Sequence, residues 1–564
     1  MDSNKPQPLE ETSAQPGPKV VDAVDQDVVD ACDLAALGHD QSLTRKFDIW
    51  SILALAFCVL GTWSTFAQDL SSGLTNGGPV SILWGLCLVT TCNVCVVVSL
   101  GELCSSMPTA LGQAYWVLRL WDTPLGRFVS YLCAWINTFG WWTLTASQTA
   151  FMTSFLLNMK VMFEPEWTGA SSGWVQFLVY LGVNALFTVF NLIACRKDKV
   201  LPLFNDFVGI GFVGLFVVLS LALLIAVGTK PGLEFQPGRF VFGTWINQTG
   251  WSDGVTWFTG LLQAAYGLTA FDSVIHMVEE IPAPRRNAPR AMWLAVVTGA
   301  ISGFIFMLVC LFCIQDLDSV IGSDVPFMQL VQDAVGLQGA AVLLALFIFN
   351  GLGQGISIFT TGSRLTWGFA RDGGIPFSAY FAKVDPTWKV PARAIVLQGV
   401  IVALVGVLYL FENTVLEAII STATIALTVS YALPILTLMI AGRDRLPPGG
   451  FRLGSLGPLI NWTSVIYCAI TTVFFFFPGE PHPAAADMNY AIAVFAVMLV
   501  VSIGFWFTKG RIAHMRATES AQAVIEAQRR EMVVHDGVPE SHFDESDPQT
   551  IPGQKKLWSW KPEL

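Results

Sequence analysis

Three ionisable side chains, Asp272, His276 and Glu280, follow one another at four-residue intervals inside an otherwise apolar stretch. Residues with this spacing share one face of a helix. An imidazole between two carboxylates can relay protons, because small changes in its surroundings move its charge across physiological pH. The alternative is a static polar ladder, in which His276 and Glu280 close an inner gate by pairing with basic loop residues.

Two further acids lie in apolar segments of the chain. Glu102 stands near the start of SLGELCSSMPTALGQAYW, and Asp206 stands in LPLFNDFVGIGFVG. A charged group at the centre of a membrane helix costs roughly 2.5–3.5 kcal/mol, so it should face a cavity or a partner. Either acid could couple proton movement or satisfy an unwound backbone, and the sequence does not rank the two.

Two short runs place a glycine beside a hydroxyl in the middle of an apolar segment. They are Leu60-Gly61-Thr62-Trp63-Ser64 and Tyr266-Gly267-Leu268-Thr269-Ala270. Paired interruptions of this kind predict two broken helices whose freed backbone groups line a cavity. The alternative is that each glycine only lets two helices pack closely.

The cavity between these breaks is the expected binding site for a small molecule. Tyr266 and Phe271 could cap an amine by cation–π attraction. Asn350 lies in a second polar, small-residue region, where it could instead bond between helices. The residues that we expect to bind the substrate are Gly61, Thr62, Trp63, Ser64, Tyr266, Gly267, Thr269, Phe271, Asp272 and Asn350. For proton coupling or gating we expect Asp272, Glu102, Asp206, His276 and Glu280.

Composition places these residues in a membrane. Of the 564 residues 53% are hydrophobic and only 13% are charged, whereas soluble domains carry roughly 25% charged residues. A helix needs about 20 apolar residues to cross a bilayer. The chain offers twelve such segments: 48–69, 79–104, 125–157, 174–194, 201–227, 254–278, 291–314, 337–369, 392–411, 415–440, 458–477 and 489–508. We therefore predict an all-α integral membrane protein with twelve transmembrane helices.

Basic residues fix the predicted orientation. Alternate loops are rich in Lys and Arg, and the intervening loops hold only Lys160, Lys230 and Arg239. Cytoplasmic loops carry the Lys/Arg excess, so both termini should be cytoplasmic. If the first five helices repeat as the next five, the odd number makes the two copies inverted. The aromatic pair Trp141–Trp142 would sit near the outer interface.

The two ends of the chain differ from this core. Residues 1–40 hold nine of the acids that give a net charge of −11, against two lysines, and have few large apolar side chains. Such composition predicts disorder. We expect a disordered acidic cytoplasmic tail at 1–46, a transport core at 47–440, two further helices at 441–510 and a cytoplasmic tail at 511–564.

Enzyme signatures are missing from the sequence. It contains no Walker loop, GxSxG or HExxH motif, so we expect neither an enzyme nor transport driven by ATP. We expect no cofactor, no metal and no nucleic acid; the expected partners are a small amine, protons and the lipid bilayer. Asn247 begins an Asn-Gln-Thr triplet in a predicted outer loop and is a candidate for N-glycosylation.

From Phe47 to Arg511 the chain resembles the amino acid–polyamine–organocation transporter superfamily, and within it the fungal amino acid/choline transporter family, which includes choline and γ-aminobutyrate (GABA) permeases. The matching segments include FDIWSILALAFCVLGTWSTF, SLGELCSSMPTALGQAYW, TAFDSVIHMVEEIPAPRRNAPRAM and GSRLTWGFARDGGIPFSAYFAKVDPTWKVPARA. FRLGSLGPLINWTSVIY and FWFTKGR are similar to the last two helices of the family.

The resemblance implies a LeuT-like fold of five-plus-five inverted repeats with two peripheral helices. It implies an ammonium group held between unwound helices one and six, and import driven by protons. Related bacterial members use a lysine in helix five in place of sodium, but segment 201–227 has no lysine, so that scheme does not carry over. The family's Asn-Ser-Trp run in helix one matches Gly61-Thr62-Trp63 here, a departure that leaves the substrate open.

Together these observations predict a multi-pass protein, expected in the plasma membrane, that imports a small amine such as an amino acid, GABA, choline or a polyamine. Proton-coupled alternating access is the expected mechanism. The alternative is a receptor-like sensor that binds an amine without net transport, which the two tails would suit. The oligomeric state is not indicated by the sequence.

Overall fold

The computed structural model describes residues 30–514, except 32, 36, 38, 40–42, 44, 46, 195, 197–198, 386–389, 411–414 and 485–487. Within this part of the chain the elements are helices, joined by loops and by one isolated β-bridge between Asn76 and Asn247. Most of both predicted tails, residues 1–29 and 515–564, lies outside the described residues.

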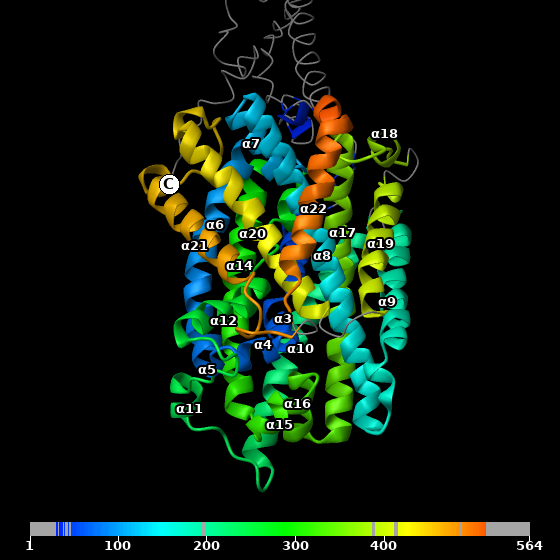
Figure 1. Ribbon diagram of the computed structural model, residues 1–564, viewed down its shortest axis with the longest axis vertical. Helices are drawn as coiled ribbons and strands as arrows, with labels where there is room; N and C mark the ends of the chain where they lie inside the picture. Colours follow the sequence, from blue (N-terminus) through cyan, green and yellow to red (C-terminus); the bar gives the residue numbers. More distant parts are fainter. Residues whose placement is uncertain are drawn as a thin grey trace, which may run out of the picture.

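The long helices run roughly parallel along the vertical axis of Figure 1. The first half contains α2 (Ile49–Leu60), α3 (Thr62–Gln68), α4 (Leu70–Thr75), α5 (Gly78–Val80), α6 (Leu86–Ser106), α7 (Gln113–Leu120), α8 (Pro124–Phe163), α9 (Gly173–Ala194), α10 (Val200–Thr229) and α11 (Gly238–Gly243). The second half contains α12 (Asp253–Gly267), α13 (Ser273–His276), α14 (Pro284–Cys313), α15 (Leu317–Ile321), α16 (Pro326–Val335), α17 (Leu337–Arg371), α18 (Ser378–Phe381), α19 (Ala392–Gly406), α20 (Val415–Ala441), α21 (Gly457–Phe474) and α22 (Ala491–Phe505).

Ten of the segments in the described chain are long and apolar enough to cross a membrane. Two of the twelve predicted spans are not among them, for different reasons. The segment predicted at 125–157 is the 40-residue helix α8, whose many Thr, Ser, Gln and Asn side chains lower its hydropathy. The segment predicted at 254–278 does not form one helix, because α12 ends at Gly267 and α13 starts at Ser273.

The first predicted break lies at Gly61. Helix α2 ends at Leu60 and α3 begins at Thr62, while Gly61 between them takes the left-handed conformation, with φ 52° and ψ 30°. A side chain other than glycine pays about 1–2 kcal/mol in this region. A Cβ on Gly61 would also lie 2.1 Å from Nε2 of Gln354. Glycine is therefore required here by the backbone and by the close approach of α17.

The second break is wider. Residues Leu268 to Asp272 separate α12 from α13, and Ala270 has a φ of 74°. The Ala270 N–H donates to the Tyr431 hydroxyl of α20 (3.1 Å), so this strained residue is held by a bond from outside its own segment. A Cβ on Gly267 would lie 2.3 Å from the Phe66 ring of α3. The second break thus packs against α3, the helix that follows the first break, and paired broken helices are confirmed.

Helix α8 and helix α20 form the centre of the bundle. They pack against each other, and α8 also packs against α17, α7 and α9. The polar residues that weaken the hydropathy of α8 are buried, among them Asn137, Ser147 and Gln148. Because a membrane helix with polar side chains must turn them towards protein rather than lipid, α8 takes the interior position.

Part of the predicted N-terminal tail lies against this bundle. Asp30 accepts a hydrogen bond from the Ala283 N–H (2.8 Å), and Asp33 forms an ion pair with Arg285 (2.7 Å). The Tyr115 hydroxyl donates to the Leu37 carbonyl (2.9 Å). These contacts meet the loop after the second break and helix α7, which lies at the top of Figure 1.

The conformation of Gly61 is open to a direct test. Gly61→Ala should lower the thermal unfolding midpoint, because alanine pays about 1–2 kcal/mol in the left-handed region and its Cβ displaces Gln354. Gly504→Ala in α22 is the matched control, since a Cβ there meets no described atom within 4 Å. Equal midpoints for the two variants of the purified protein would contradict the assigned break.

Candidate functional site

Asp272 lies at the second break and is fully buried, with an exposed fraction of 0%. Its Oδ1 accepts a hydrogen bond from the Tyr431 hydroxyl (2.6 Å). Its Oδ2 accepts from Gln113 Nε2 (2.8 Å) and from the Trp141 indole N–H (3.2 Å). These donors come from α20, α7 and α8, so three separate helices converge on one carboxyl group.

His276 provides the fourth contact to this carboxyl group. Its Nε2 lies 3.0 Å from Asp272 Oδ2, and its Nδ1 lies 2.9 Å from the Ala110 carbonyl oxygen. A carbonyl oxygen can only accept, so Nδ1 carries a hydrogen. The predicted i, i+4 pair of Asp272 and His276 is therefore formed, across the single turn of α13.

The arrangement requires one more proton. Two acceptor atoms do not approach to 3.0 Å without a hydrogen between them. The proton resides either on His276 Nε2, giving an imidazolium and a carboxylate, or on Asp272, giving a neutral pair. Asn137 Nδ2 lies 3.3 Å from the same ring nitrogen, and rotation of its amide offers either a donor or an acceptor. The site can thus hold one shared proton in either position.

Magnitudes explain why so many donors gather here. Burying a single charge costs several kcal/mol even after the protein relaxes. A hydrogen bond to a charged group contributes about 1.5–3 kcal/mol, so no single donor of the Asp272 site offsets that cost. Four contacts from α7, α8, α13 and α20 can together keep a charged group buried at this position.

Aromatic and hydroxyl groups extend this site on the side of α12. The Tyr266 hydroxyl lies 2.7 Å from Ser147 Oγ of α8. Phe271 packs on Tyr431, with ring centroids 4.8 Å apart. Thr269 turns back and donates to the Ala265 carbonyl (2.6 Å), which satisfies an acceptor freed by the end of α12. Phe271 thus shares Tyr431 with Asp272, whereas the contacts of Tyr266 and Thr269 are with Ser147 and Ala265.

Residues at the first break form two groups: some hydrogen-bond to polar side chains, and others pack between helices. Ser64 accepts from Gln68 Nε2 (3.0 Å), and Gln354 Nε2 donates to Thr65 (3.2 Å). Trp63 instead packs among aromatic rings, with centroids 5.0 Å from Phe212 and 4.9 Å from Phe306. Thr62 faces α14, where a Cβ on Gly299 would lie 2.5 Å from its Oγ1. Trp63 and Thr62 are thus packed between helices.

Asn350 is the predicted pocket residue whose surroundings differ most from the expectation. It lines an apolar crevice of about 550 Å³ together with residues of α9 and α10. Its Oδ1 would lie 3.6 Å from a Cβ placed on Gly211 of α10. None of its described contacts joins it to Asp272. Its neighbour Gln354, one helical turn later, is the amide of α17 that reaches the first break.

The remaining acids lie apart from Asp272. Glu280 pairs with Arg364 (2.9 Å), and Glu102 pairs with Arg443. Asp206 is half-buried beside Asp48 and Ser51 at the start of α2. The predicted ladder of Asp272, His276 and Glu280 is therefore wrong beyond His276, because the chain changes to a 3-10 turn at Val278–Glu280.

A second ion pair lies beside that of Glu280. Both oxygens of Glu279 accept from Arg371, at 2.9 and 3.0 Å, and one also accepts from the Ala110 N–H (3.2 Å). Burial by itself raises the pKa of the Glu279 carboxyl, but the charge and hydrogen bonds of Arg371 hold that pKa below its ordinary value. These pairs link the segment after α13 to the end of α17.

The amino acid permease family model matches residues 47–500. The chain belongs to the amino acid permease family. It is similar to a choline transporter of Saccharomyces cerevisiae, with 29% identity over 86% of this chain and 85% of that protein. It is also similar to a GABA-specific permease of the same yeast, at 26% identity over 85% and 82% of the two chains, and to an amino-acid permease of Arabidopsis thaliana, at 26% over 85% and 94%.

Several residues that contact Asp272 in this permease could not be predicted from the sequence. Gln113 and Tyr431 lie far from Asp272 along the chain, and nothing in their own segments marks them. Trp141 was expected near the outer interface, and that prediction is wrong, because its side chain is fully buried against Asp272. One feature of the sequence could have indicated the position of Trp141: the many polar residues of α8 are typical of a helix in the interior of the bundle.

Asn247 of the permease is held in a tight turn. Its Nδ2 donates to the Trp251 carbonyl (2.8 Å) and to Asp253 (3.0 Å), and its Oδ1 accepts from Thr249. Hydrogen bonds from Asn247 and Trp245 lower the pKa of Asp253. A sugar on Nδ2 would remove one of the two donated bonds and would weaken this turn.

The Asn247 turn generates a simple prediction. Endoglycosidase treatment should leave the electrophoretic mobility of the expressed permease unchanged, because both amide hydrogens of Asn247 are used within the turn. A shift that disappears in the Thr249→Val variant would show that a glycan occupies Asn247 and that the turn opens to admit it.

The buried ion pair of Glu280 and Arg364 generates a stability prediction. Both side chains are 2% exposed, so Glu280→Gln should destabilise the permease by about 3–5 kcal/mol by leaving the guanidinium without its carboxylate. Glu164→Gln removes the exposed pair with Lys160 and should change little. Thermal unfolding of the purified variants checks this, and similar losses for both would contradict the assigned burial.

Proposed function

We propose that this permease is a secondary active transporter that imports a small amine, such as an amino acid, GABA, choline or a polyamine, together with protons. The observation that carries the proposal is the Asp272–His276 pair, which lies at a helix break and requires a shared proton (3.0 Å). The similarity to a choline transporter and to a GABA-specific permease supports an amine as substrate.

The proposed roles follow from the contacts. An amine bound at the second break would meet backbone groups of the interrupted segment and the rings of Tyr266 and Phe271. Its positive charge would favour the carboxylate form of Asp272, and so would favour the shared proton on His276. Movement of α20 would withdraw Tyr431 from both Asp272 and Ala270. Protonation and helix movement would thereby be coupled.

The proposal includes alternating access in a core of five-plus-five inverted repeats, followed by two peripheral helices. The chain would cross the membrane twelve times. Ten of these spans are the long apolar segments, and α8 and the interrupted α12–α13 segment would be the other two. Both termini would be cytoplasmic and the protein would lie in the plasma membrane. The pairs Glu279–Arg371 and Glu280–Arg364 would then close the inner side, while Glu102 and Asp206 would serve gating rather than substrate contact.

The central test is uptake of radiolabelled choline and GABA by cells that lack their own permeases, competed by amino acids and polyamines. Wild-type uptake should fall on addition of a protonophore. Asp272→Asn should abolish uptake while surface expression is kept, because the proton-sharing carboxyl group is lost. His276→Gln should leave exchange of the amine but remove its dependence on pH.

Two outcomes would count against this function. Normal, protonophore-sensitive uptake in both variants would remove the Asp272–His276 pair from the mechanism. Saturable binding of an amine to the wild-type protein with no flux under any imposed gradient would favour the sensor instead. Glu164→Gln is the control for expression, because it removes an exposed ion pair at the C-terminal end of α8, far along the helix from Asn137 and the Asp272 site.

A further inference from the structure

A single residue in the loop between α6 and α7, Ala110, contacts both the Asp272–His276 pair and the ion pair of Glu279. Its carbonyl oxygen accepts a hydrogen bond from His276 Nδ1 (2.9 Å), and its N–H donates to Glu279 Oε1 (3.2 Å). Ala110 and Glu279 are both buried. A buried polar group that loses its hydrogen-bond partner pays its full desolvation cost, so neither bond is lost without consequence. The two pairs are therefore joined through one residue.

The loop that carries Ala110 lies directly against α13. Gly112, two residues later, has a φ of 49°, and a Cβ there would lie 2.4 Å from Cγ2 of Ile275, the residue before His276. The Gly112 N–H donates to the Thr109 carbonyl (3.0 Å), which closes the loop into a tight turn. A displacement of this loop would therefore move the hydrogen-bond acceptor of His276.

Arg371 of α17 holds Glu279 in place for its contact with the loop. Both oxygens of the Glu279 carboxylate accept from the guanidinium, at 2.9 and 3.0 Å, and Oε1 also accepts from the Ala110 N–H. A bidentate pair of this kind fixes the geometry of the carboxylate as well as balancing its charge. The next residue, Glu280, pairs with Arg364 instead. Of the two adjacent acids, Glu279 is therefore the one that can act on the proton-sharing pair.

We propose that Glu279 is a positioning residue for proton transfer. While paired with Arg371, it holds the Ala110 carbonyl against the ring of His276. This bond keeps Nδ1 protonated and leaves Nε2 to share the proton with Asp272. Movement of α17 away from the segment after α13 would separate the ion pair, free the loop and remove the acceptor from the ring. The shared proton would then pass to water that enters between the helices, leaving a neutral imidazole and a carboxylate. The inference rests on the proposed function, because it assigns a role in the same proton-coupled uptake.

The surroundings of His276 contain one acid in direct contact and otherwise neutral groups. Asp272 lies 3.0 Å from Nε2. From α8 come the Asn137 amide (3.3 Å) and the ring of Trp141, with centroids 5.7 Å apart. Behind the loop carbonyl lies the carboxylate of Glu279. An anion at that position favours the positively charged form of the imidazole.

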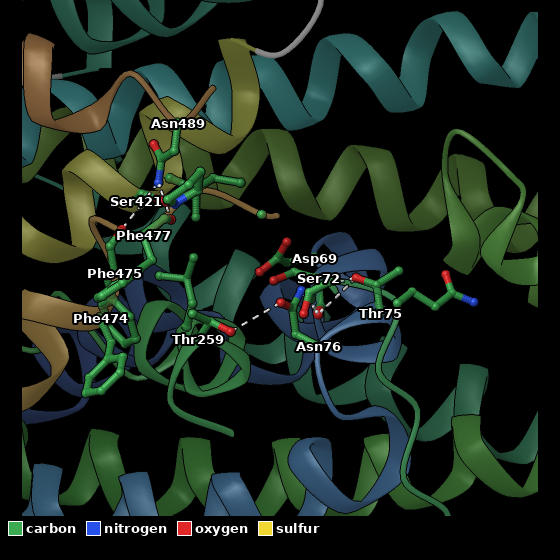
Figure 2. Close-up of a pocket in the computed structure, with 16 residues that line it drawn as sticks. Asp69, Ser72, Thr75, Asn76, Thr259, Ser421, Phe474, Phe475, Phe477 and Asn489 are labelled. Carbon is green, nitrogen blue, oxygen red and sulfur yellow. Dashed lines mark hydrogen bonds between the residues drawn. The ribbon is translucent and has the colours of Figure 1, made fainter. Parts of the chain in front are cut away.

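Glu279 is itself faced by cationic groups. Arg371 pairs with it, and His39 of the N-terminal segment acts on its charge. His39 also lies 3.8 Å from Asp372, the residue after Arg371. Asp69, the acid that follows α3, lines a separate cavity of about 230 Å³ (Figure 2). A neutral residue in place of Glu279 would thus leave an excess of positive charge behind the loop, which disfavours a positively charged imidazole.

The first test is the pH dependence of uptake of radiolabelled choline and GABA into proteoliposomes, at a constant pH difference across the membrane. Glu279→Gln should move the pH of half-maximal uptake down by about one unit, because the anion behind the loop is lost. Glu280→Gln is the matched control, since it removes a buried carboxylate one residue away. It should lower stability but leave the pH of half-maximal uptake unchanged. His39→Gln should also leave it unchanged, because the contact of Glu279 with Ala110 remains.

A charge-reversed double variant separates this role from simple closure of the inner side. Glu279→Arg with Arg371→Glu can re-form an ion pair between the two positions, but a guanidinium cannot accept a hydrogen bond from the Ala110 N–H. The double variant should therefore keep the shift to lower pH. Hydrogen–deuterium exchange, read by mass spectrometry on the peptide that contains Ala110, should become severalfold faster in this variant than in the wild type, because the amide loses its protecting bond.

Three results would overturn the proposal: an unchanged pH of half-maximal uptake in Glu279→Gln, its return to the wild-type value in the double variant, or unchanged exchange at the Ala110 amide. An equal shift in Glu280→Gln would overturn it as well, because lost stability would then explain the effect. Absence of proton-dependent uptake by the wild type, with amide exchange as expected, would count against the proposed function alone and would leave Glu279 as the residue that fixes the loop.

Discussion

The carboxyl group of Asp272 is the constraint on which the centre of this protein depends. It is buried, and among the described residues its hydrogen-bond partners are His276 and neutral donors from α7, α8 and α20. Each of these bonds offsets part of the cost of a buried charge. The position of the three helices around the second break is therefore tied to the protonation state of one group.

That link explains the polar character of α8 and the strain in the second break. Trp141, Asn137 and Ser147 are costly in a membrane helix unless they face protein, and all three meet partners at this site. Ala270 adopts a positive φ because Tyr431 holds its N–H. The hydroxyl of the same tyrosine donates to Asp272. If Tyr431 moved away, the buried carboxyl group would lose a hydrogen bond and the strained backbone at Ala270 would be released.

The features that depend on neighbouring residues could be predicted from the sequence. Gly61 and Gly267 mark the breaks because each stands beside a hydroxyl in an apolar run, and Asp272 and His276 pair because one helical turn joins them. Features could not be predicted where the chain leaves regular structure or where distant helices meet. The change to a 3-10 turn at Val278 separates Glu280 from His276, and no local pattern reveals that Gln113 or Tyr431 reaches Asp272.

The central question is whether the Asp272–His276 pair carries a transported proton. Proteoliposomes that contain the purified protein and a trapped pH indicator, at equal pH on both sides, should acidify inside when the best-transported amine is added outside. The His276→Gln protein should exchange the amine without acidification. Equal acidification by wild-type and variant liposomes would contradict the shared proton as the coupling element.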